Sequence, residues 1–251
     1  MKGKKWLVLL VFVITTAALI GYSGMRRSMA HDWRTASRAS IGVAPDPAEV
    51  REAVVQVYAA RAWGWRGAFG VHSWIAVKPT DAARFTVYEV IGWRARRGMS
   101  AVSVGYRDPD GRWFGSAPDL IADLRGPGVD DTIKRVDAAA RNYPHAFEYR
   151  VWPGPNSNTF IAHVARQVPE LKVDLPPTAI GKDYIPNGGV VARAPSGTGY
   201  QVSLFGLLGV LVGIEEGLEI NLLGFTFGVD AKNPALKLPG VGRVGSESTS
   251  G

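Results

Sequence analysis

Residues 154–160 read GPNSNTF, and this stretch organises the expected fold around the start of a helix. Two prolines, Pro153 and Pro155, stiffen the chain just before an Asn-Ser-Asn triplet, whose side chains are of the kind that cap helix N-termini. Apolar residues then follow at helical spacing, at positions 160, 161, 164 and 168. We therefore predict a rigid loop, a polar cap and an amphipathic helix over 157–168.

Ser157 in this stretch has two interpretations. Serine and asparagine at a helix start ordinarily cap the helix and do nothing more. A hydroxyl at that position also lies in the positive field of the helix N-terminus, beside unpaired backbone N–H groups. This environment suits a nucleophile whose attack creates an oxyanion. The stretch alone leaves both interpretations open.

The composition is that of a globular, basic chain. Its 251 residues carry a net charge of +7, and 46% of them are hydrophobic, which is enough to form a core. The absence of cysteine excludes disulfides, thiolate metal sites and a Cys nucleophile. The positive charge suits an anionic membrane or wall polymer, whereas no motif for nucleic acid occurs. We also find no motif for a metal or nucleotide, so we expect no cofactor.

The N-terminus has the pattern of a membrane or export segment. Three lysines lie within residues 2–5, and residues 6–22 are uncharged and almost wholly apolar, near the shortest length that spans a bilayer. We predict that residues 1–30 form an uncleaved inner-membrane anchor; the triplet Ser-Met-Ala at 28–30 leaves a cleaved signal peptide as the alternative. In both cases the body should face the periplasm or the cell exterior.

The rest of the chain is predicted to comprise a linker over 31–50, one α+β domain over 51–245 and a disordered tail over 246–251. The domain should hold a mainly antiparallel sheet, because β-branched and aromatic residues alternate in its first half. Strands are expected at 53–60, 70–77 and 85–93, with a Gly/Trp loop at 61–68 and a further hairpin around the DPDG turn at 108–111.

Two helices are expected before the one at 157–168, a short one at 118–124 and a longer one at 130–142. Two apolar runs, at 203–214 and 220–229, are too short to span a bilayer as helices, and their glycines disfavour long helices. We predict that they form a buried β-hairpin, and a hairpin that dips into the membrane is the alternative.

His72 is the histidine that could act with Ser157. It lies near the start of an apolar strand, where a histidine is usually a satisfied core residue. A strand histidine that faces a helix-capping nucleophile could instead take the nucleophile's proton. Glu89, on the next strand, could orient His72, although it could also form a structural salt bridge to an arginine. The candidate site comprises Ser157, His72 and Glu89 as catalytic residues, with Asn156 and Asn158 as oxyanion support.

The order of these features resembles that of circularly permuted papain-like domains. In the NlpC-type peptidases, the PPPDE-type peptidases and the lecithin:retinol acyltransferase-like proteins of that group, an early strand His precedes a helix-capping Cys. The PPPDE type places this Cys in an Asn-Cys-Asn context, which Asn156-Ser157-Asn158 matches with Ser at the nucleophile position. The resemblance implies a packed central helix on an antiparallel sheet. Serine departs from the pattern, since it ionises far less readily than cysteine.

Longer strings resemble the bacterial domain-of-unknown-function family 3750, which implies no established activity. These strings include VQVYAARAWGWRGAFGVHSWIAVKP at 55–79, WPGPNSNTF at 152–160, LPPTAIGKDY at 175–184 and LKLPGVGR at 236–243.

Two functions are therefore expected for an exported envelope protein. The first is a Ser/His hydrolase or acyltransferase that acts on an amide or ester bond in envelope material, lipid or peptidoglycan. The alternative is a non-catalytic derivative of the papain-like fold that binds lipid or glycan. In that case a groove would be lined by the tryptophans at 63, 65, 74, 93 and 152, which could otherwise be core residues.

Overall fold

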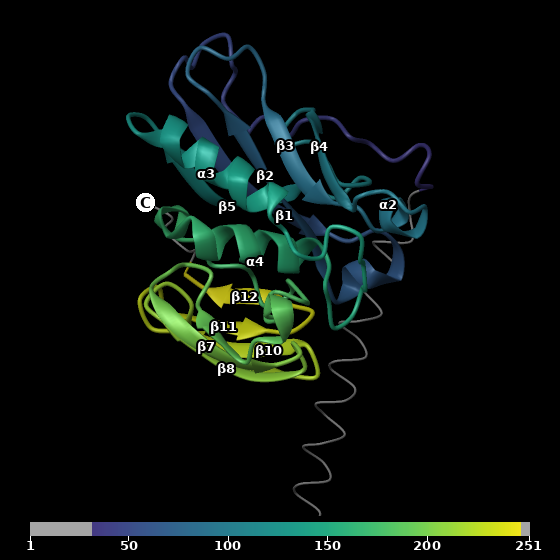
Figure 1. Ribbon diagram of the computed structural model, residues 1–251, viewed down its shortest axis with the longest axis vertical. Helices are drawn as coiled ribbons and strands as arrows, with labels where there is room; N and C mark the ends of the chain where they lie inside the picture. Colours follow the sequence, from purple (N-terminus) through teal and green to yellow (C-terminus); the bar gives the residue numbers. More distant parts are fainter. Residues whose placement is uncertain (1–31, 247–251) are drawn as a thin grey trace, which may run out of the picture.

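The protein is an α+β fold with antiparallel strands, as the sequence predicts, but it has two sheets with a helix between them instead of one. The computed structural model describes residues 32–246 (Figure 1). The first sheet has five strands in the order β4-β3-β2-β1-β5, and the second has seven in the order β12-β11-β10-β9-β8-β7-β6. Helix α4 (Ser157–Gln167) lies between the two sheets. Its N-terminus is therefore close to both.

The first sheet is built on two central strands that are buried on both faces. One face packs against the helices and contributes Val57 and Ile75 to the larger core, whereas the other carries Tyr58, Trp74 and Val87 in a smaller cluster. β-Branched and aromatic side chains fit such a pleated, buried surface. Its strands are β1 (Val54–Arg61), β2 (Val71–Lys78), β3 (Thr86–Val90), β4 (Val102–Tyr106) and β5 (Pro118–Arg125).

Two helices cover the first of these faces. Helix α3 (Val129–Arg141) begins with two aspartates, which suit the positive helix N-terminus, and buries Ile133 and Val136. Helix α4 buries Phe160 and Ile161, each stabilising the core by roughly 1.5–3 kcal/mol relative to an exposed side chain. The predicted helices at 130–142 and 157–168 are confirmed.

The predicted helix at 118–124 is wrong, because this segment is strand β5. It pairs antiparallel with the free edge of β1 over almost its whole length, with Val55 opposite Leu124 and Ala59 opposite Asp119. Hydrogen bonds along that edge outweigh a weak local preference for helix.

Three further local predictions need correction. The strand expected at 85–93 ends at Val90, and a short helix, α2 (Gly92–Arg96), follows it. The Gly/Trp loop at 61–68 contains a 3-10 helix, η1 (Gly64–Ala68). Residues 112–114 do not pair with β4 as a hairpin; an isolated bridge joins Trp113 to Ser116 instead.

The second sheet is an antiparallel meander with a polar inner face. Lys237 Nζ lies 2.7 Å from Asp174 and 2.8 Å from Glu219, which also pairs with Lys182. These groups are buried, and mutual pairing is what makes such burial tolerable. The strands are β6 (Val191–Arg193), β7 (Gly199–Leu204), β8 (Leu208–Gly213), β9 (Gly217–Leu222), β10 (Phe225–Asp230), β11 (Ala235–Leu238) and β12 (Gly242–Gly245).

The apolar runs at 203–214 and 220–229 form strands, but the predicted burial is wrong. Successive side chains of a strand point to opposite faces, so a polar inner face places the apolar residues outside. Val210, Ile220 and Phe227 are 46%, 43% and 43% exposed. The usual arrangement of a sheet packed on a core, with apolar residues inside, is reversed here.

The predicted anchor or signal segment at 1–30 lies outside the described residues, as do residues 247–251 of the predicted tail. Between residues 32 and 246, no helix has the length and apolarity needed to cross a bilayer.

Candidate functional site

A cavity of about 550 Å³ opens where the first sheet, the start of α4 and the second sheet meet. Its lining comes from the turn between β1 and β2, from the segments at 113–114 and 149–158, and from the β9–β10 turn. Most of the lining side chains are aromatic or aliphatic, and His72 and Ser157 are among the few polar ones. A concave, mostly apolar site with a few polar groups is typical of small-molecule binding sites.

The predicted tryptophan groove is found in part. Trp63, Trp65 and Trp152 line the cavity, as expected if the protein binds a ligand there. Trp74 is instead fully buried in the core, and Trp93 is exposed and lies outside the lining.

Asn156 fixes the start of α4 on the cavity wall. Its Oδ1 accepts hydrogen bonds from the backbone N–H groups of Asn158, at 2.9 Å, and Thr159, at 3.2 Å, so Asn156 is the N-cap. Its Nδ2 donates to the carbonyls of Val151, at 3.1 Å, and Ile180, at 2.9 Å. The capping role predicted for the triplet is thus performed by Asn156.

Asn158 joins the same helix turn to strand β2. Its Nδ2 donates to the carbonyls of Val71, at 3.1 Å, and Ile180, at 2.8 Å, while its Oδ1 accepts from the Ser73 hydroxyl at 2.8 Å. The amide donors of Asn156 and Asn158 are therefore both engaged with backbone carbonyls. Their role as side-chain oxyanion donors stays a prediction, and this structure uses them to hold the helix in place.

Ser157 is the residue that the helix start presents to the cavity. It is the first helical residue and is only 3% exposed. Among the hydrogen bonds of the described residues, none involves its hydroxyl or its backbone N–H. One donor of the first turn, in the positive field of the helix end, is thus left for a ligand.

His72 and Glu89 form the predicted pair. His72 Nε2 lies 2.9 Å from Glu89 Oε2, and the Arg107 guanidinium lies 3.5 Å from the other carboxylate oxygen. Burial favours the neutral form of Glu89, but the hydrogen bond from His72 and the charges of His72 and Arg107 outweigh it, so the pKa of Glu89 is lowered. Both interpretations of Glu89, as a partner of histidine and of an arginine, are seen together.

Trp113 holds the His72 ring from one side. The two rings are stacked with centroids 3.7 Å apart and an interplanar angle of 15°. Since Nε2 faces Glu89, Nδ1 is the ring nitrogen that could exchange a proton with a nucleophile.

The alternation of side chains along β2 determines whether the His72 side chain points toward Ser157. His72 stacks with Trp74 on the side of the smaller cluster, whereas Val71 and Ile75 face the helices. The β2 side chain that turns toward the start of α4 is Ser73, whose hydroxyl meets Asn158. His72 thus lies on the face of β2 that points away from α4, and Ser157 lies at the start of α4 on the other side; both line the cavity. Proton transfer between them stays a prediction.

Three residues of this site were not predicted, namely Ser73, Arg107 and Trp113. Ser73 could have been found, because the period of two along β2 places it on the face of Val71 and Ile75, where a helix must pack. Trp113 and Arg107 reach His72 and Glu89 through an irregular segment, for which the sequence has no periodic signal. No group of three or more His, Asp or Glu side chains suited to a metal ion occurs between residues 32 and 246.

Comparisons with known proteins agree with one of the two resemblances. The family described as "Protein of unknown function (DUF3750)" matches residues 52–184, more than half of the chain, and this range contains both α4 and the His72 strand. No curated protein and no solved structure matches the chain. The chain therefore belongs to the DUF3750 family.

Proposed function

We propose that the cavity binds an apolar ligand of the acyl-chain class, with the polar end of the ligand at Ser157. The observation that carries this proposal is the aromatic lining, in which Trp63, Trp65, Trp113, Trp152 and Phe225 surround a space of about 550 Å³. Large aromatic side chains gain most from apolar contact. A cavity of this size falls in the range that accommodates a ligand as large as a fatty acid.

The polar groups of the cavity favour lipid over glycan. A glycan presents many hydroxyl groups, each of which needs a hydrogen-bond partner when it leaves water. The amides of Asn156 and Asn158 are already bonded to backbone carbonyls. The backbone N–H and the hydroxyl of Ser157 suit one polar end, such as a carbonyl or a carboxylate, in the field of the helix N-terminus.

A fatty acid that quenches tryptophan fluorescence tests this proposal. We expect 9,10-dibromostearate to quench the full-length protein saturably, because four lining residues are tryptophans. Ala62→Phe adds a ring to the cavity lining and should weaken binding at least tenfold, a cost of about 1.4 kcal/mol. Ala138→Phe, on the exposed side of α3, is the matched control and should bind normally. Equal binding by both variants would contradict the proposal.

A second candidate is a Ser/His hydrolase or acyltransferase on the same cavity, in a derivative of the permuted papain-like fold. It is supported by the His72–Glu89 pair at 2.9 Å and by the presence of His72 and Ser157 in one lining. His72 Nδ1 would take the hydroxyl proton as Ser157 attacks an ester or amide carbonyl, and the oxyanion would meet the Ser157 N–H.

A fluorophosphonate probe separates the two candidates. Catalysis predicts labelling of the wild type that is lost in both Ser157→Ala and His72→Ala. Binding without catalysis predicts no labelling of any of the three proteins, together with normal dibromostearate binding by Ser157→Ala.

The envelope location belongs to the same proposal. The lysines at 2, 4 and 5 and the apolar run at 6–22 support an inner-membrane anchor with the body outside the cytoplasm, near envelope lipid or peptidoglycan. A reporter enzyme fused after residue 40 should be active only when exported. Activity in the cytoplasm would contradict this location.

A further inference from the structure

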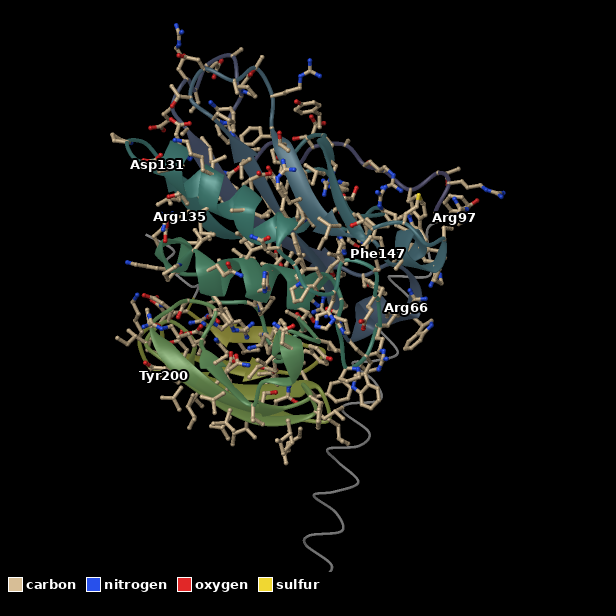
Figure 2. The ribbon with its side chains drawn as sticks, viewed as in Figure 1. Arg66, Arg97, Asp131, Arg135, Phe147 and Tyr200 are labelled. Atoms are coloured by element: carbon tan, nitrogen blue, oxygen red, sulfur yellow. The ribbon has the colours of Figure 1, made fainter. Side chains whose placement is uncertain are left out.

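The outer face of the second sheet is an exposed apolar surface. Along strands β6–β12 the outward positions carry one charged side chain, Arg193 in the edge strand β6. Val212, Leu218 and Leu236 are 58%, 44% and 51% exposed. Figure 2 shows side chains of β7 and β8 that point away from the body, with Tyr200 at the edge of this face. Contiguous apolar surfaces of this kind mark sites of interaction with a protein or a membrane.

Two turns extend this face toward the mouth of the cavity. Phe205, between β7 and β8, and Leu223, between β9 and β10, have φ values of 53° and 55° and are 67% and 66% exposed. The left-handed conformation costs a residue with a side chain about 1–2 kcal/mol, and asparagine or aspartate is usual in such hairpin turns. In water, an exposed apolar side chain at such a turn does not offset the cost of the left-handed conformation. In lipid, removing the side chain from water stabilises the turn and offsets this cost.

The apolar face and the cavity meet at Leu223. This residue lines the cavity, and its carbonyl accepts a hydrogen bond of 2.8 Å from Trp152 Nε1. Trp152 also lines the cavity and is 51% exposed. A tryptophan with one apolar and one polar edge is typical of the boundary between lipid and water.

The residues that precede position 32 favour a bilayer, and not another protein, as the partner of the outer face. The apolar run at 6–22 is predicted to be a membrane anchor, and the structure begins at residue 32. The nine intervening residues, 23–31, can extend at most about 32 Å, so an anchored body stays close to the lipid surface. Arg193, the charge on the outer face, has the sign that anionic phospholipids attract.

We propose that the outer face of the second sheet, with the Phe205 and Leu223 turns, docks on a phospholipid bilayer and places the mouth of the cavity at the lipid surface. Lipid contact would remove this apolar area from water without a second protein. The ligand proposed above would then enter from the membrane. The docking itself does not depend on that ligand, because the face is apolar whether or not the cavity binds anything.

Single labelled cysteines test the docking in the full-length chain, which has no cysteine of its own. Val210→Cys places an environment-sensitive nitrobenzoxadiazole label on the outer face, and Ala138→Cys places it on the exposed side of α3 as the control. Both proteins are reconstituted in nanodiscs of phosphatidylglycerol and phosphatidylcholine. Lipids with a doxyl group on the acyl chain should quench the label at 210 at least threefold more than the label at 138, and iodide in the water should do the reverse.

Two outcomes would overturn the docking. If iodide reaches both labels equally, the face is open to water. The label at 210 could also be shielded from iodide without being quenched by doxyl lipid. If self-quenching then shows two labels close together, the face is covered by a second copy of the chain. Failure of dibromostearate to bind the cavity leaves the expected doxyl result unchanged, so the two proposals fail separately.

Discussion

Replacing Asn156 with alanine tests whether this side chain holds the cavity wall together. The substitution removes the N-cap of α4, which costs about 1 kcal/mol. It also removes two hydrogen bonds from Nδ2 to the carbonyls of Val151 and Ile180, each with a net value of about 1 kcal/mol. Because Ile180 keeps a bond of 2.8 Å from Asn158 and Val151 can bind water, we expect a total loss of about 2–3 kcal/mol.

Thermal unfolding of the full-length protein in a mild detergent, followed by tryptophan fluorescence, measures this loss. For a body of this size the melting temperature should fall by about 4–12 °C. Asn142→Ala, at the exposed C-terminal end of α3, is the matched control and should change stability by no more than about 0.5 kcal/mol. If Asn156→Ala costs no more than the control, Asn156 does not anchor the helix start.

Two further predictions concern the same site. Glu89→Gln should remove part of the acid sensitivity of the fold, because the lowered pKa of Glu89 means that its ionised form stabilises the fold above pH 4.5 and that this contribution is lost as the pH falls through the lowered pKa. Urea titrations should therefore show that the wild type is more stable than the variant at pH 7 and that this difference shrinks toward pH 3. A difference that stays constant with pH would contradict the pairing with His72 and Arg107. Gly181→Ala should destabilise the fold by about 1–3 kcal/mol more than Gly188→Ala. Both glycines have positive φ, but a Cβ at 181 would lie 2.4 Å from Asn156 Nδ2, whereas a Cβ at 188 would meet nothing within 4 Å. Equal melting temperatures of the two variants would contradict the close approach at 181.

The sequence predicts the parts of the fold that local patterns determine. Strands β1 and β2 and helices α3 and α4 carry clear alternation or helical spacing, with two aspartates in the first turn of α3 and a side-chain cap at the start of α4. A short apolar run such as DLIADL at 119–124 suits both a helix and a strand, so the local pattern does not decide the structure of this segment. Pairing with the free edge of β1, which is distant in sequence, makes it strand β5.

The second sheet shows a different limit of sequence reasoning. Its alternation predicts strands correctly, but alternation does not say which face points inward. The inward face is fixed by Lys182, Asp174 and Glu219, which form an ion-paired cluster with Lys237 from three separate segments. Apolar residues are ordinarily assigned to the core, which is why the sequence predicts burial of these runs, and the alternative of a membrane-dipping hairpin is the one that allows for an exposed face.

The candidate site was predictable to the extent that adjacent strands define it. Glu89 and His72 lie on one face of neighbouring strands, and the structure brings them to 2.9 Å. The relation of His72 to Ser157 depends on how α4 packs against β2, and there Ser73, not His72, faces the helix. The cavity itself needs the β9–β10 turn, which no local pattern connects to residue 157.

The central claim is that the cavity between the two sheets binds an apolar acyl chain. The most direct test is photo-crosslinking of the full-length protein with a diazirine fatty acid, followed by mass spectrometry of its peptides. The account predicts that the modified residues come from the cavity lining at 62–72, 149–158 and 223–225, and that Ala62→Phe reduces them while Ala138→Phe does not. Modification confined to the outer strand positions, such as Val210 and Ile220, with none in the lining, would contradict it.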